Sequence, residues 1–267
     1  MKRKTKQNLI FCTAIILIIA VSFLITYKTV NNNSSEPETQ LQVTAGQKVI
    51  DKVQKYASDH GYAMSDYPAR LLTLLENHPE SEAFVMEYPK YKDKSSEPNM
   101  KEYKKCSSVP LFIQWDQRWG YAPYGDGIVG LDGCGPTCLS MCAVYYLQDT
   151  KLSPDYVADY AYQKGYYKNG VGSTWDLFTK GGTKLGLSVR ELPLDESVMK
   201  NALQQGDSII LSVGEGDFTT KGHFIVVTGY ADEGFKVNDP NSYKNSEKLW
   251  TYERLSPQIK NLWAVNK

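Results

Sequence analysis

The sequence predicts an α+β fold for residues 108–267, and three observations lead to this prediction. Apolar residues recur at helical spacing as far as about residue 206. Beyond that point the pattern changes to short apolar runs separated by turn residues, which is typical of antiparallel strands. The run from Gly133 to Leu147 is apolar on most of its faces, which is typical of a buried helix. We therefore expect N-terminal helices packed on an antiparallel sheet.

The chain begins with a basic tail, residues 1–8, followed by nineteen uncharged, mostly apolar residues, 9–27. A helix of that length spans about 28 Å, close to the thickness of a bilayer core. A cleaved signal peptide is the main alternative, but residues 25–28 offer no small-residue cleavage site. We expect a retained transmembrane signal-anchor in the cell membrane, with everything after Lys28 outside the cytoplasm. Cleavage would instead give a secreted protein.

Two linkers flank a helical extension. Residues 28–45 are polar, residues 46–89 have helical spacing, and residues 90–107 are charged and interrupted by proline. The extension has three possible roles: an inhibitory pro-segment, a spacer, or an addition packed on the following domain. Its stretch LLTLLENHPESEAFVMEY is rich enough in apolar residues to need a surface to bury against, which favours packing.

The elements of the domain at 108–267 follow from start signals and changes of period. Proline or serine near the start of the first three helices, and glycine at the end of the fourth, indicate helices at 133–147, 153–165, 173–186 and 195–206. Short apolar runs bounded by turn residues indicate strands at 208–213, 223–230, 235–240, 248–252 and 262–265.

Composition and motifs argue against several classes of function. Thirty basic residues balance thirty acidic ones, so nothing indicates a nucleic-acid partner. The chain has no G-x-x-x-x-G-K-[ST] phosphate loop, so no ATP is expected, and no cofactor is implied. The cysteines at 134, 138 and 142 lack the tight thiolate pairs of zinc sites, so no metal is expected. The sequence does not indicate an oligomeric state.

Cys134, Cys138 and Cys142 recur at intervals of four in the predicted helix. That spacing gives poor geometry for a disulfide. Cys134 lies at the helix start, where the helix dipole and a nearby imidazolium lower the pKa of a thiol. Gly133 and Gly135 on either side are expected to leave room for a substrate backbone. We interpret Cys134 as a candidate nucleophile and the two deeper cysteines as packing residues. Cys106 has no evident partner.

Candidate partners for this thiol lie on both sides of it in the sequence. His223 and Asp239 fall on successive predicted strands, where one register would make them diagonal neighbours and let the carboxylate orient the imidazole. The sequence does not fix that register, and Asp239 also suits an Asx turn before a proline. Gln114 and Gln117 are both candidate oxyanion donors, and physical reasoning from the sequence does not choose between them.

The order Gln, Cys, His, Asp resembles that of papain-like cysteine peptidases. More closely, VPLFIQWDQRWG, GLDGCGPTCLSM, GHFIVVTGY and VNDPNS resemble family thirty-nine of the cysteine peptidases in its freestanding form. That branch is related to the leader-trimming peptidase domains of bacteriocin exporters. The resemblance covers 108–267 and implies a papain-like fold and hydrolysis of peptide bonds. It implies Cys134 as nucleophile, His223 as base, Asp239 as orienting acid and Gln114, in the V-P-x-x-x-Q run, as oxyanion donor.

The sequence departs from the exporter versions in ways that affect the expected substrate. Those versions lie on the cytosolic side of a transporter, whereas this domain is expected outside the cytoplasm. Its peptide or protein substrate therefore need not be a double-glycine leader. Two alternatives stay open: an amidase acting on cell-wall peptides with the same residues, and a non-enzymatic peptide-binding domain. None of the four catalytic roles is missing, which favours an enzyme.

Overall fold

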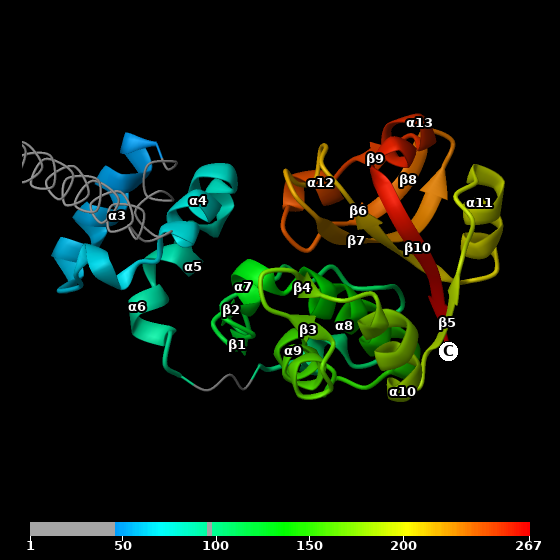
Figure 1. Cartoon of the computed structure of the whole chain (residues 1–267), viewed down its shortest axis with the longest axis horizontal. Helices are drawn as coiled ribbons and strands as arrows, with labels where there is room; N and C mark the ends of the chain where they lie inside the picture. The colour runs from blue at the N-terminus through cyan, green and yellow to red at the C-terminus, as the bar shows by residue number, and fades with distance from the viewer. Residues whose placement is uncertain (1–45, 95–97) are drawn as a thin grey trace, which may run out of the picture.

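The computed structural model describes residues 46–94 and 98–267, as a helical extension, a helical layer and a sheet (Figure 1). The predicted basic tail 1–8, signal-anchor 9–27 and linker 28–45 lie outside the described residues. Within the described ranges no helix is long and apolar enough to cross a membrane.

The extension is a group of short helices joined by tight turns. Its elements are α3 (Gln47–His60), the 3₁₀ turn η1 (Met64–Asp66), α4 (Ala69–Asn77), the 3₁₀ turn η2 (Pro79–Ser81), α5 (Glu82–Met86) and α6 (Tyr88–Tyr91). α4 is amphipathic, and its apolar side packs into a core shared with the following domain, which includes Ile113, Trp115 and Tyr121.

The helical layer surrounds the long helix α8. Its elements are η3 (Lys101–Tyr103), the hairpin β1 (Pro123–Tyr124) and β2 (Gly127–Ile128), α7 (Val129–Asp132), α8 (Cys134–Leu147), α9 (Pro154–Gln163), the hairpin β3 (Tyr167–Lys168) and β4 (Gly172–Ser173), the π-helix η4 (Leu177–Gly182) and α10 (Thr183–Leu185). The predicted helix 173–186 is wrong at its start. Ser173 does not cap it, because the residue lies in β4 and its hydroxyl hydrogen-bonds to the hydroxyl of Tyr124 at 2.7 Å.

The sheet, as far as the described residues go, has six antiparallel strands in the order β5-β10-β6-β7-β8-β9. The strands are β5 (Ser188–Glu191), β6 (Ser208–Val213), β7 (His223–Ala231), β8 (Gly234–Asn238), β9 (Leu249–Trp250) and β10 (Ile259–Asn266). The accompanying helices are α11 (Glu196–Gln204), α12 (Tyr243–Ser246), α13 (Tyr252–Leu255) and η5 (Ser256–Gln258).

Strand prediction failed mainly at the sheet edges. β5 was not predicted, because this edge strand is largely exposed and its sequence SVRE lacks a clear apolar alternation. The predicted strand 248–252 shrinks to Leu249–Trp250, because Thr251 accepts a hydrogen bond from Arg254 N–H and caps α13. β10 is longer than the predicted 262–265 and pairs with both β5 and β6.

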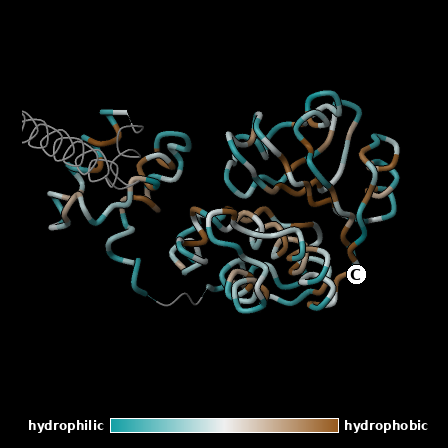
Figure 2. The backbone as a smooth tube through the Cα atoms, viewed as in Figure 1, coloured by the Kyte–Doolittle hydropathy of each residue, from teal (hydrophilic) through white to brown (hydrophobic). Residues whose placement is uncertain are grey.

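The sheet is covered on both faces by helices, and alternate residues of its strands enter different cores. One face packs on the layer of α8, with Ile210, Phe224, Val226, Trp263 and Val265 among its members. The opposite face packs beneath α11, with Ile209, Leu211, Ile225, Val227 and Leu262 among its members. Hydrophobic residues are frequent along the central strands and α8, as the hydropathy colouring shows (Figure 2). The chain therefore has the expected mixed α/β architecture of helices on an antiparallel sheet.

Phe84 of α5 fixes the extension to the helical layer. Its ring lies so close to Gly120 and Gly130 that a Cβ atom at either glycine would come within 2.7 Å and 2.4 Å of it, respectively. Phe84 is only 2% exposed, and its ring stacks on that of Tyr121 with centroids 4.5 Å apart. The two glycines of the following domain thus make room for a side chain of the extension.

Polar contacts join the same two parts. The Arg70 guanidinium of α4 donates to the Asp132 carboxylate at the end of α7, with Nη1 to Oδ2 at 2.9 Å. The hydroxyl of Tyr121 donates to the carbonyl of Phe84 at 2.9 Å. Of the three roles considered for the extension, these contacts are those of a packed addition rather than of a detached spacer.

Candidate active site

Cys134 is the first residue of α8. The short helix α7 ends at Asp132, Gly133 forms the N-cap, and the chain continues directly into the fourteen-residue α8. The thiol is half-buried, whereas residues 135–144 of the same helix are buried. The backbone N–H groups of a first helical turn have no partner within the helix, so the sulfur lies beside free donors at the positive end of the dipole.

The glycines on either side of Cys134 do not leave open space, so the expectation that they make room for a substrate backbone is wrong. A Cβ atom on Gly133 would lie 2.5 Å from the carbonyl oxygen of Val129. A Cβ atom on Gly135 would lie 2.4 Å from the hydroxyl of Ser173. Both glycines are required by close packing against the chain itself, which fixes the position of the turn that carries the thiol.

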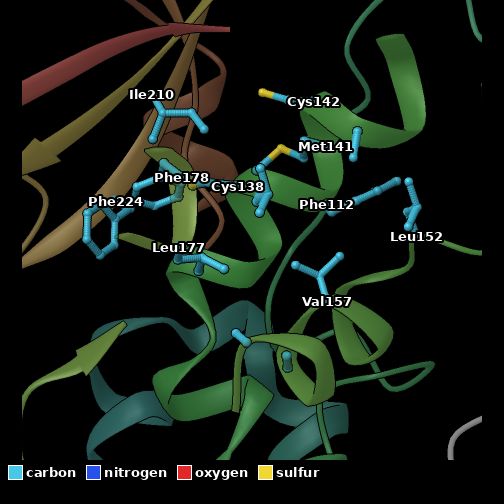
Figure 3. Close-up of a cluster of buried hydrophobic side chains, with 14 of the residues drawn as sticks. Phe112, Cys138, Met141, Cys142, Leu152, Val157, Leu177, Phe178, Ile210 and Phe224 are labelled. Carbon is cyan, nitrogen blue, oxygen red and sulfur yellow. The ribbon is translucent and has the colours of Figure 1, made fainter. Parts of the chain in front are cut away.

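Cys138 and Cys142 are completely buried, one and two turns deeper in α8. Figure 3 shows them among Phe112, Met141, Leu177, Phe178 and other apolar side chains of the main core. Burial raises the pKa of Cys138 well above its usual value and raises that of Cys142 to about 12. Both thiols therefore stay protonated and unreactive in the folded protein, as expected for packing residues.

His223 and Asp239 are brought together by the pairing of β7 with β8. Val226 pairs with Asn238, so Asp239 would lie opposite Ile225 and diagonally from His223. The imidazole Nε2 lies 2.7 Å from Asp239 Oδ1, and both side chains are buried. The register left open by the sequence is thus the one that joins these two residues.

Asp239 is held by several donors besides the imidazole. The N–H of Asn241 donates to Oδ1 at 2.9 Å, which is the Asx turn considered as an alternative, and Asn245 Nδ2 donates to Oδ2 at 2.8 Å. Burial acts to raise the pKa of Asp239, but the charge of His223 and these hydrogen bonds outweigh it and hold the pKa below its usual value. The Asx turn and the contact with His223 therefore occur together.

His223 contacts Cys134 as well as Asp239. Because Nε2 faces the carboxylate, Nδ1 is the imidazole nitrogen left for the thiol, which lies within hydrogen-bonding reach. Burial acts to lower the pKa of His223, but Asp239 and Cys134 outweigh it and raise the pKa to about 10. An imidazole that stays protonated beside a sulfur at a helix N-terminus is the arrangement that stabilises a thiolate.

The two candidate glutamines have different surroundings. Gln114 is 4% exposed, its backbone N–H donates to Pro240 O at 2.7 Å, and its side-chain Nε2 donates to Gly130 O at 3.0 Å. Gln114 therefore joins Pro240, the residue after Asp239, to Gly130 of α7, and no residue in the described part of the chain accepts the second hydrogen of its amide. Gln117 instead faces the extension, where its Nε2 donates to Ala83 O at 3.0 Å.

A known protein family matches more than half of the chain. The sequence model of the Peptidase_C39 like family matches residues 106–267. The chain belongs to this family. No curated protein matches the chain.

Two solved structures are similar to this chain. The peptidase domain of Streptococcus ComA, described as a bifunctional ABC transporter involved in a quorum-sensing pathway, is 20% identical with a TM-score of 0.38. The match covers 51% of this chain and 91% of that one. A putative C39-like peptidase from Bacillus anthracis is 14% identical with a TM-score of 0.36, over 60% of this chain and 94% of that one.

In this Peptidase_C39-like protein, sequence reasoning missed the residues that support Asp239. Asn241 and Asn245 act on it from the turn and helix after β8, and Ser246 Oγ accepts its backbone N–H at 2.9 Å. The run of turn-forming residues after Asp239 was the available signal. His78 of the extension, which contacts Asn241, carried no signal, because 163 residues separate the two.

Proposed function

We propose that the protein is a cysteine peptidase of papain-like architecture in which Cys134 is the nucleophile, His223 the base and Asp239 the orienting acid. The observation that carries the proposal is the constellation itself: a half-exposed thiol at a helix N-terminus, within reach of an imidazole whose other nitrogen is 2.7 Å from a buried carboxylate. Membership of a peptidase-like family supports the same conclusion.

The geometry supports acyl transfer through a covalent intermediate. The Cys134 thiolate attacks the carbonyl carbon of a peptide bond, and the His223 imidazolium donates its proton to the departing amine. The oxyanion that forms is stabilised by the backbone N–H of Cys134 and by Gln114 Nε2. Water, deprotonated by the now neutral His223, then hydrolyses the acyl-enzyme and restores the thiolate. Asp239 keeps the imidazole oriented throughout and does not take the proton.

We also propose that residues 9–27 anchor the protein in the cell membrane with the peptidase domain outside the cytoplasm. The support is the uncharged run behind a basic tail. Membrane fractionation of cells that make the full chain, followed by protease treatment of spheroplasts, tests this. Release of a shortened protein beginning between residues 28 and 46 would contradict the retained anchor.

Incubation of the full chain and of a fragment 46–267 with a random peptide library tests the proposed activity. We expect defined peptide bonds to be cleaved by the wild type and none by Cys134→Ala. Clearing of wall material in a zymogram without cleavage of library peptides would indicate a cell-wall peptide amidase with the same residues. Peptide binding unchanged in Cys134→Ala, with no hydrolysis by either protein, would indicate a binding domain.

A further inference from the structure

His78 joins the helical extension to the loop that carries Asp239. The residue lies where α4 ends and η2 begins, and its backbone is fixed by hydrogen bonds to Leu74 O at 2.8 Å and from Ser81 N–H at 2.9 Å. Its imidazole Nε2 lies 3.0 Å from Nδ2 of Asn241, which is 163 residues further along the chain. The packing of Phe84 and the Arg70–Asp132 ion pair keep this part of the extension in place.

Asn241 is held on three sides. Its backbone N–H donates to Asp239 Oδ1, the same oxygen that faces His223 Nε2. Its carbonyl accepts a hydrogen bond from Trp115 Nε1 at 3.3 Å, and its side-chain amide contacts His78. Its Oδ1 is buried without a hydrogen-bond partner in the described part of the chain, so the contact with His78 is the side-chain anchor that the structure provides.

The donor roles in this contact follow from the chemistry of the two groups. An amide Nδ2 only donates, so Nε2 of His78 accepts and the imidazole is neutral with its proton on Nδ1. Burial lowers the pKa of His78 and favours the neutral form, while Glu80 and Asp239 raise this pKa and His223 lowers it. His78 is thus an acceptor built into the extension and directed at the loop after β8.

We propose that His78 is a positioning residue for the candidate active site: it fixes the side chain of Asn241, whose backbone N–H orients Asp239 toward His223. The proposal rests on the proposed function, because it assigns the extension a role in that same site. The extension then does more than bury apolar surface. It supplies the outermost link of a chain of contacts that runs from His78 through Asn241, Asp239 and His223 to Cys134.

The rate at which iodoacetamide alkylates Cys134 at mildly acidic pH tests the proposal without a known substrate. In the full chain, His78→Ala is expected to lower this rate about tenfold, the effect of one lost buried hydrogen bond, because the imidazolium that stabilises the thiolate is less well held. His78→Gln keeps an acceptor and should stay within about twofold of the wild type. The control is His60→Ala, since His60 is an exposed histidine of the same extension, stacked on Tyr56, and its removal should change nothing.

Asn241→Ala provides an independent arm that also covers a His78→Ala protein that does not fold. This variant should lower the alkylation rate as much as His78→Ala does. The double variant should be alkylated no more slowly than Asn241→Ala, because the effects of two substitutions that break the same chain of contacts do not add. The proposal would be overturned if Cys134 in His78→Ala were alkylated at the wild-type rate. It would also be overturned if His78→Ala and His78→Gln lowered the alkylation rate equally, or if the two single effects on the rate added up in the double variant. Rapid alkylation of Cys134 in a protein that hydrolyses no peptide would instead contradict the proposed function.

Discussion

The first turn of α8 and the two turns that follow carry the same residue in different surroundings. Cys134 in the first turn is half-exposed, lies at the positive end of the helix and contacts His223. Cys138 and Cys142 are fully buried among apolar side chains, where burial raises the pKa of each thiol. One helix thus supplies both a candidate nucleophile and part of the core, and position along the helix decides which.

The difference teaches that the reactivity of a thiol is set by what surrounds it, not by the residue alone. The helix dipole fades within about one turn, so the deeper cysteines gain little from it. The sheet supplies the remainder, because the pairing of β7 with β8 joins His223 to Asp239, and His223 interacts with Cys134 of the first turn. Substitutions in the first turn of α8 and in the deeper turns should therefore differ widely in their effects on hydrolysis.

The largest expected effect is that of Cys134→Ala. Loss of the nucleophile should reduce peptide hydrolysis to background, a fall on the order of 10⁴–10⁶, while circular dichroism and the melting temperature stay close to those of the wild type. Cys138→Ala is the matched control on the same helix and should keep most of the activity. Full hydrolysis by Cys134→Ala would remove the distinction between the two turns.

Gln114→Ala should give the next largest effect. Loss of one oxyanion donor typically lowers kcat about 10²–10³-fold without unfolding the protein. Gln117→Ala is the control, because that side chain faces Ala83 of the extension and should leave kcat near normal. Steady-state kinetics on a peptide selected from the library distinguishes the two, and the reverse result would mean that the oxyanion donor lies three residues away from Gln114.

The buried pair His223–Asp239 should give the folded state a characteristic pH dependence. The pKa of His223 is raised from 6.5 to about 10, so its contribution to the free energy of unfolding is complete below about 6.5 and is lost as the pH rises through about 10. The pKa of Asp239 is lowered from 3.8, so its contribution is complete above about 3.8 and is lost as the pH falls through the lowered value.

The pair should therefore stabilise the protein most between about pH 3.8 and 6.5. Urea unfolding of the wild type and of a His223→Gln/Asp239→Asn variant across the pH range measures this. The difference between the two free energies of unfolding should shrink on both sides of that window. A difference that stays constant from acid to alkaline pH would show that the pair is not ionised.

The smallest effect expected is that of Cys138→Ala on stability. Removing the sulfur of a fully buried cysteine leaves a small cavity in the main core and should lower the free energy of unfolding by about 1 kcal/mol. Cys134→Ala, at a half-exposed position, should cost less. Chemical denaturation of the two variants makes the comparison, and a larger loss for Cys134→Ala would indicate a structural role for that thiol.

Local sequence patterns were enough to predict much of the fold. The change from helical to strand period located the helical layer and the sheet, and the buried character of α8 followed from its apolar faces. The start of the predicted helix 173–186 was wrong because the hydroxyl of Ser173 contacts Tyr124, a partner distant in sequence, whereas residues 177–185 are helical as expected. The strand β5 was not predicted, because an exposed edge strand needs little apolar alternation in its sequence. In these two failures the deciding contact or exposure is tertiary, whereas the predicted strand 248–252 was shortened by the local cap that Thr251 provides for α13.

The candidate site divides in the same way. Cys134 could be singled out because a helix start is a local signal, and the structure brings His223 and Asp239 to it. Their diagonal contact depends on the β7–β8 register, which includes a bulge between Val227 and Gly229 that no local pattern announced. The contact between His78 and Asn241 depends on how the extension docks, which is a property of the whole fold.

The most direct test of the contrast along α8 is to follow alkylation of Cys134, Cys138 and Cys142 by iodoacetamide at mildly acidic pH, using mass spectrometry of the native protein. We predict that Cys134 is modified first, that hydrolysis is lost in step with its modification, and that Cys138 and Cys142 react only after unfolding. In His223→Ala the modification of Cys134 should require a higher pH. Slow modification of all three cysteines together, and only on unfolding, would contradict the assignment of Cys134 as the nucleophile.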